Sequence, residues 1–169
     1  MSLTGLPILV RPATSSDLPG ILDILNAAIR DTQAIWKDEP VDLASRKAWF
    51  AERRRQNHTI LVANMGDALV GFASTGDFRS QPGFRHVCEN SVYVRNGCTR
   101  RGIARRLMKA LIPAAKRAGK RHMVAAIGLP NEASIKLHEA LGFRQVGLMP
   151  GIGVKQGQAL DLCLMQLEL

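Results

Sequence analysis

The chain has 169 residues, with 23 lysines and arginines against 14 aspartates and glutamates, which gives a formal net charge of +9. Its hydrophobic fraction of 46% is ordinary for a globular protein, and its length predicts one domain, residues 1–169. No apolar run approaches the roughly 20 residues that span a bilayer, and the first residues lack the basic and apolar regions of a signal peptide. These features argue against a membrane-spanning protein and predict a soluble, cytoplasmic one.

The positive charge favours an anionic ligand, either a phosphorylated small molecule or a nucleic acid. Aromatic residues make up 5% of the chain and do not interleave with the basic clusters, which argues against stacking on single-stranded nucleic acid. Cys88, Cys98 and Cys163 have neither C-x-x-C spacing nor clustered histidines. The sequence therefore predicts no metal site, no disulfide framework and no nucleic-acid partner.

Hydrophobic periodicity and turn residues divide the chain into strands and helices in the order β-α-α-β-β-β-α-β-α-β-β. A capping box of Thr14 and Asp17 begins the first helix, Asp42 caps the second, and Gly66 lies in a hairpin signal between two strands. The predicted strands cover residues 7–11, 59–64, 68–74, 88–94, 122–127, 143–149 and 160–169, and the predicted helices cover residues 14–29, 42–55, 102–118 and 130–141.

The most informative segment covers residues 92–107, where a short strand enters a polar loop and a helix opens at Gly102. The first N–H groups of a helix have no partner within it and favour an anion. Gly102 and Ala104 would let a pyrophosphate approach the backbone, and nearby arginines add donors. The alternative is a surface strand–turn–helix with a solvated basic face.

This segment resembles the cofactor-binding motif of the GNAT superfamily of acetyl-CoA-dependent N-acyltransferases, written Q/R-x-x-G-x-G/A. Gly102 and Ala104 match its last two positions, whereas Thr99 stands where Gln or Arg is usual. The resemblance implies an α+β (three-layer α/β) fold with a mixed, mostly antiparallel sheet flanked by helices. It also implies that acetyl-CoA enters where the strand before the loop separates from the next strand. The cofactor-binding residues implied are Val92, Tyr93, Val94, Arg100, Arg101, Gly102, Ile103, Ala104, Arg105, Asn131 and Ser134.

Several separate segments also resemble the branch of this superfamily that acetylates phosphinothricin, methionine sulfoximine and methionine sulfone. These segments are residues 34–36, 40–42, 76–79, 89–94, 128–131 and 137–143, and a pattern across residues 149–167. The branch implies direct acetyl transfer, in a ternary complex, to the α-amine of a small amino acid. It also implies a homodimer formed through sheet edges and C-terminal segments, although a monomer stays open.

The resemblance assigns chemistry to three side chains in particular. Glu89 is the expected general base for the ammonium group, and His138 the expected donor of a proton to the CoA thiolate. Arg79 has a guanidinium suited to a carboxylate or phosphinate. The substrate-binding residues implied are Trp36, Arg79, Ser80, Gln81, Glu89, Asn90 and Ser91. By pattern alone these residues also fit a strand-end acid, a surface histidine, a solvated loop arginine and a core tryptophan.

The chain departs from the branch at positions that bear on the acceptor. Phe78 stands where Trp is common, Asn90 replaces a frequent His, and Gln156 and Ala159 replace frequent aromatic residues. If the C-terminal segment borders the acceptor site, the pocket is wider or differently lined. Three alternatives stay open: acetylation of a protein N-terminus or another small amine, a basic nucleic-acid-binding module, and a non-catalytic acyl-CoA binder.

Overall fold

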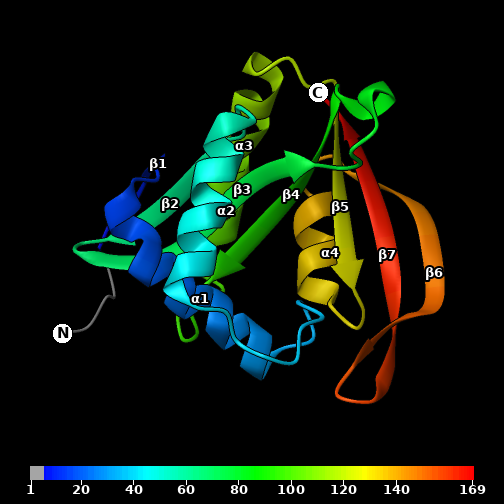
Figure 1. Ribbon diagram of the computed structural model, residues 1–169, viewed down its shortest axis with the longest axis horizontal. Coiled ribbons are helices and arrows are strands. Elements are labelled where there is room, and N and C mark those ends of the chain that lie inside the picture. Colours follow the sequence, from blue (N-terminus) through cyan, green and yellow to red (C-terminus); the bar gives the residue numbers. More distant parts are fainter. Residues whose placement is uncertain (1–5) are drawn as a thin grey trace.

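The computed structural model describes residues 6–169, which form a seven-stranded sheet with helices on both faces (Figure 1). The strands are β1 (Ile8–Pro12), β2 (Ile60–Met65), β3 (Ala68–Asp77), β4 (Val87–Val94), β5 (His122–Gly128), β6 (Arg144–Lys155) and β7 (Gln158–Glu168). The helices are α1 (Leu18–Asp31), α2 (Leu43–Arg55), α3 (Ile103–Arg117) and α4 (Glu132–Glu139), with short 3-10 helices η1 (Ser15–Asp17) and η2 (Pro82–Phe84).

The described strands follow the order β1-β2-β3-β4-β5-β7-β6 across the sheet. Strands β4 and β5 run parallel, and the other neighbouring pairs run antiparallel. The α+β fold with a mixed, mostly antiparallel sheet is therefore confirmed. The first five residues of the predicted domain lie outside the described residues, and none of the described helices is both long and apolar enough to cross a membrane.

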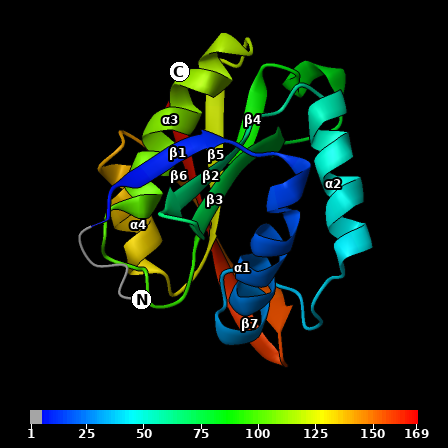
Figure 2. The same ribbon diagram turned by 90° about the vertical axis from the view of Figure 1, so that its left-hand side faces the viewer.

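Two apolar clusters hold the helices against opposite faces of the sheet (Figure 2). Helix α1 buries Ile21, Leu25 and other residues at helical spacing, and these pack with Phe50 of α2 and Phe72 of β3. On the other face, α3 buries a stripe that begins at Ile103. Burial of such stripes is the main stabilising term of the fold.

Strands β4 and β5 separate soon after they begin. Their pairing joins Val87–Glu89 to His122–Val124, and beyond Glu89 each strand continues with its other neighbour. The separation that the sequence resemblance implied is thus present. It opens the sheet beside the part of β4 that follows Glu89, where Asn90 and Ser91 lie.

The predicted elements are all present, and β3 and β6 extend beyond their predicted ends. Residues 75–77, expected in a loop, extend β3, because Gly76 is a paired strand residue rather than a turn residue. The segment after Met149, which lies outside the predicted strands, extends β6 to Lys155 and turns through Gln156 and Gly157, both with positive φ. An edge strand tolerates its Pro and Gly residues because the register with β7 is interrupted there.

Candidate active site

The loop before α3 has the geometry of an anion site. Gly102 has φ of +76° and Arg100 has φ of +61°, so the backbone turns sharply into the helix. The N–H of Arg106 donates to the carbonyl of Gly102 at 3.0 Å. The N–H groups of the first helical turn therefore precede the first intrahelical bond and are free to bind an anion.

A cavity of about 590 Å³ lies at this helix N-terminus, between β4, α3 and α4. Its wall includes every residue of the predicted cofactor set except Arg101: Val92, Tyr93, Val94, Arg100, Gly102, Ile103, Ala104, Arg105, Asn131 and Ser134. Thr99 also lines it. The donors present are backbone N–H groups and guanidinium groups, and these fit the pyrophosphate of CoA.

A second cavity, of about 300 Å³, lies between the separated strands β4 and β5. Its wall includes Trp36, Glu89, Asn90, Ser91 and His138, five residues predicted to act on the acceptor or in catalysis. The two cavities share the lining residues Ala34, Val92, Tyr93, Asn131 and Ser134. A thioester and an acceptor amine can therefore meet along β4.

Arg79, Ser80 and Gln81 do not line either cavity. All three are exposed in the segment after β3, and the Arg79 guanidinium lies 5.0 Å from the ring centre of Phe78. Position 78 still supplies an aromatic surface for that arginine, although Phe78 replaces the tryptophan that is common there.

Glu89 lies in the part of β4 that still pairs with both neighbours, opposite Gly76 of β3. Burial raises the pKa of its carboxyl group, and the positive charges of Arg53 and then Arg79 oppose this rise in pKa. A raised pKa suits a carboxylate that must take a proton from an ammonium group.

His138 and Asn90 connect α4 to β4 and β5. The Nδ1 atom of His138 lies 2.8 Å from the carbonyl oxygen of Ser134, and its Nε2 lies 3.1 Å from Oδ1 of Asn90. Asn90 Nδ2 donates to the carbonyl of Val124 at 3.1 Å. Each ring nitrogen thus faces an oxygen acceptor. Burial lowers the pKa of His138, and the Ser134 carbonyl opposes this effect.

Trp36 is held in a slot between two glycines. Its Nε1 donates to the carbonyl of Gln33 at 3.1 Å, and a Cβ on Gly128 or Gly153 would collide with its indole. Lys155, which is 4% exposed, holds the same loop in place through its ammonium group. Its Nζ donates to the backbone carbonyls of Ile29, Thr32 and Ile35. Sequence reasoning assigned no role to Lys155, Gly128 or Gly153, although all three lie in segments that carry the resemblance.

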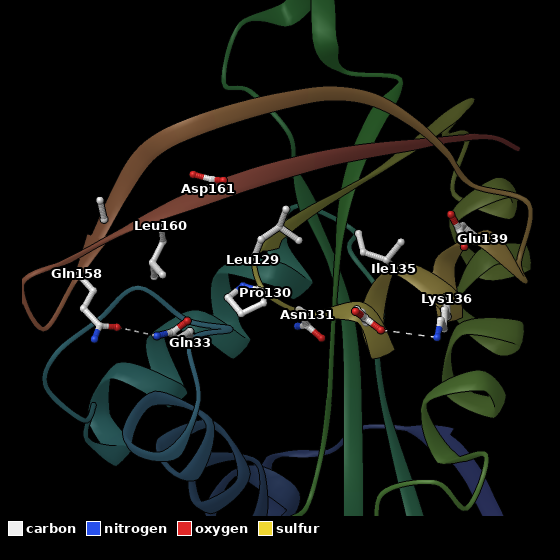
Figure 3. Close-up of a pocket in the computed structure, with 12 residues that line it drawn as sticks. Gln33, Leu129, Pro130, Asn131, Ile135, Lys136, Glu139, Gln158, Leu160 and Asp161 are labelled. Carbon is white, nitrogen blue, oxygen red and sulfur yellow. Dashed lines mark hydrogen bonds and ion pairs between the residues drawn. The ribbon is translucent and has the colours of Figure 1, made fainter.

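The departures at Gln156 and Ala159 do not border the cavity that holds Glu89. The N–H of Gln156 donates to Asp38 at 3.1 Å. Ala159 lines a separate cavity of about 930 Å³ beside α4 and β7. Figure 3 shows this cavity between Ile135 and Leu160, with the Gln33–Gln158 hydrogen bond at one side.

Comparison with known proteins agrees with this geometry. The chain is 50% identical over 161 residues to the L-methionine sulfoximine/L-methionine sulfone acetyltransferase of Pseudomonas aeruginosa, covering 95% of this chain and 94% of that one. A Salmonella typhimurium acetyltransferase solved with acetyl-CoA has a TM-score of 0.93 and 43% identity, covering 96% and 94% of the two chains.

A phosphinothricin acetyltransferase from Sinorhizobium meliloti, solved with acetyl-CoA, also has a TM-score of 0.93, at 31% identity, covering 96% of this chain and 88% of that one. The family model described as "Acetyltransferase (GNAT) family" matches residues 21–143. The chain therefore belongs to the GNAT family of acetyltransferases, for which acetyl-CoA is the cofactor.

Proposed function

We propose that this protein acetylates the α-amino group of a small amino acid analogue, such as methionine sulfoximine, methionine sulfone or phosphinothricin. The observation that carries the proposal is the meeting of the two cavities along β4, with Glu89 in the smaller cavity and the α3 loop in the larger. The relative at 50% identity, which is named for the first two of these acceptors, supports the acceptor class.

In this proposal, the free N–H groups of α3 and the guanidinium groups of Arg100 and Arg105 hold the CoA pyrophosphate. Val92, Val94 and Asn131 bind the pantetheine arm through hydrogen bonds, and Arg101 contributes charge from outside the cavity. When bound, acetyl-CoA supplies an acetyl group activated as a thioester.

Glu89 takes a proton from the acceptor ammonium, which leaves the amine with a free lone pair. The amine nitrogen then forms a bond to the acetyl carbon as the carbon–sulfur bond breaks, with both substrates bound. His138 supplies the proton that the departing sulfur takes. In this step Nε2, which faces Oδ1 of Asn90 on β4, gives up its proton, while Nδ1 keeps its contact with the Ser134 carbonyl.

The remaining acceptor contacts come from three places in this proposal. Trp36 forms a wall, and Asn90 and Ser91 supply polar atoms from β4. Arg79, with Ser80 and Gln81 beside it, reaches the polar side chain of the acceptor from the rim.

We also propose that the protein is a cytoplasmic homodimer. Strand β6 is an edge of the described sheet and exposes a row of large apolar residues: Val146, Leu148, Met149, Ile152 and Val154. A long apolar edge strand is suited to association with a second copy. Light scattering coupled to gel filtration tests this part, since a monomer at micromolar concentration would contradict it.

The acceptor is tested by release of CoA thiol from acetyl-CoA in the presence of methionine sulfoximine, methionine sulfone, phosphinothricin, common amino acids or short peptides. The proposal predicts turnover with the sulfur or phosphorus amino acids and much slower turnover with peptides. Faster acetylation of peptide N-termini than of any free amino acid would instead support the protein-acetylating alternative.

A further inference from the structure

Helix α2 presents two arginines to the sheet. Arg46 and Arg53 are seven residues apart and so share one face of the helix. The Arg46 guanidinium lies 4.9 Å from the ring centre of Trp49, which packs edge-on against Phe72 of β3. The Nε atoms of both arginines are buried without a hydrogen-bond partner among residues 6–169. Buried donors of this kind usually have a partner.

Arg53 lies directly on Gly76. A Cβ built on that glycine would collide with Nη1, Cζ and Nη2 of Arg53, so the flat guanidinium occupies the space of a side chain. Gly76 pairs with Glu89, and side chains of directly paired residues project on the same face about 5 Å apart. The guanidinium therefore lies beside the proposed base. Among residues 6–169 Arg53 forms no ion pair within 4.0 Å.

We propose that Arg53 binds the α-carboxylate of the acceptor amino acid, an assignment that rests on the proposed function. The amine and the carboxylate of an amino acid share one carbon atom. A cation that binds the carboxylate must therefore lie next to the base that receives the ammonium proton. Arg53 satisfies this condition, whereas Arg79 lies farther along the chain in the exposed segment after β3.

The pKa of Glu89 also indicates that Arg53 is the nearer of the two arginines. Arg53 lowers the pKa of Glu89 more than Arg79 does, as expected for the nearer charge. The two arginines then bind opposite ends of the acceptor. Arg53 takes the carboxylate through a pair of parallel N–H···O bonds, and Arg79 takes the tetrahedral sulfone, sulfoximine or phosphinate group at the other end.

The test compares methionine sulfone with the amine that lacks only its carboxylate, in the wild type and in Arg53→Met. Loss of a charge-paired partner predicts a fall in kcat/KM for the amino acid of at least about 30-fold, mostly through KM. The variant should acetylate the amine within about threefold of the wild type. Arg54→Met is the matched control, because Arg54 is the exposed neighbour on α2 and should leave both acceptors unchanged.

Gly76→Ala tests the role of Arg53 independently, without removing its charge. The added methyl group displaces the guanidinium, and Gly76 is not among the positive-φ glycines, so alanine suits the backbone. In Gly76→Ala, kcat/KM should fall for the amino acid but not for the amine, as in Arg53→Met. The double variant should show no larger fall in kcat/KM than Arg53→Met alone.

Equal losses for both acceptors would overturn the assignment, because Arg53 would then serve Glu89 or the fold. Unchanged kinetics in Arg53→Met would overturn it as well. If the wild type acetylates neither compound, the proposed function itself fails, and that result is distinguishable from a failure of Arg53 alone.

Discussion

Asn90 and His138 face each other across 3.1 Å, and through this contact α4 is tied to the place where β4 and β5 separate. The amide of Asn90 is oriented by its bond to the Val124 carbonyl, so its oxygen is directed to Nε2. Full hydrogen bonding of the imidazole therefore requires a proton on each nitrogen, while burial favours the neutral ring. The two effects oppose each other at a proposed proton donor.

Asn90→Asp should raise the pKa of His138. The carboxylate would face Nε2 and favour the doubly protonated ring, so we expect the pKa to rise by at least about one pH unit. NMR titration of the His138 ring signals measures this value directly. An unchanged or lower pKa would show that residue 90 does not act on the imidazole.

The pH dependence of kcat/KM should report the ionisation of the Glu89 carboxyl group. Only the ionised carboxylate accepts a proton, and burial raises its pKa, so the acidic limb should lie above the ordinary glutamate value of about 4.3. Arg79 opposes that rise, so Arg79→Met should move the limb to higher pH. Arg117→Met, at the end of α3, is the control. A limb that moves to lower pH in Arg79→Met would contradict this account.

Much of the fold and of the cofactor loop could be predicted from the sequence because their signals are local. Gly102 has the positive φ that a strand–loop–helix turn requires, and Asn131 caps α4 through a bond from the Ser134 N–H. The apolar spacing of α1 and α3 predicted the buried faces. Such features depend on a few consecutive residues and need no knowledge of distant contacts.

The residues that sequence analysis missed, Arg53 and Lys155, make contacts with residues that are distant in the sequence. Arg53 belongs to a run of three arginines that reads as a solvated helix end, and its position on Gly76 exists only once α2 packs against β3. Lys155 likewise meets three carbonyls that are more than 100 residues earlier in the sequence. Glycine spacing alone could not distinguish a turn from the slot that holds Trp36.

Lys155→Met should destabilise the protein and loosen the loop that carries Trp36. Three backbone carbonyls would lose a buried, charged donor, which costs about 2–3 kcal/mol of the free energy of unfolding. Urea denaturation measures this change, and Lys109→Met on the exposed face of α3 is the control. A loss below about 0.5 kcal/mol would mean that the three bonds contribute little.

Asp17 should stabilise the protein in a pH-dependent way. It accepts two bonds of 2.7 Å from Arg11 and one of 2.8 Å from the Thr14 N–H, which lower its pKa from 3.8 to about 2. Because the folded pKa is depressed, the stabilisation is present above about pH 4 and disappears as the pH falls toward 2. Asp17→Asn should lose about 1–2 kcal/mol at pH 7, and a difference from wild type that persists at pH 2 would refute this explanation.

The most direct test of the central claim is acetylation of methionine sulfone by Glu89→Gln, measured together with acetyl-CoA binding by calorimetry. We predict that kcat falls by at least about 100-fold, while the Kd for acetyl-CoA stays within about twofold, because Glu89 lines the smaller cavity and not the cavity at the α3 loop. Glu132→Gln, an exposed glutamate that pairs with Lys136 at the start of α4, should keep full activity. Full turnover by Glu89→Gln with α-N-acetylated product would contradict the account.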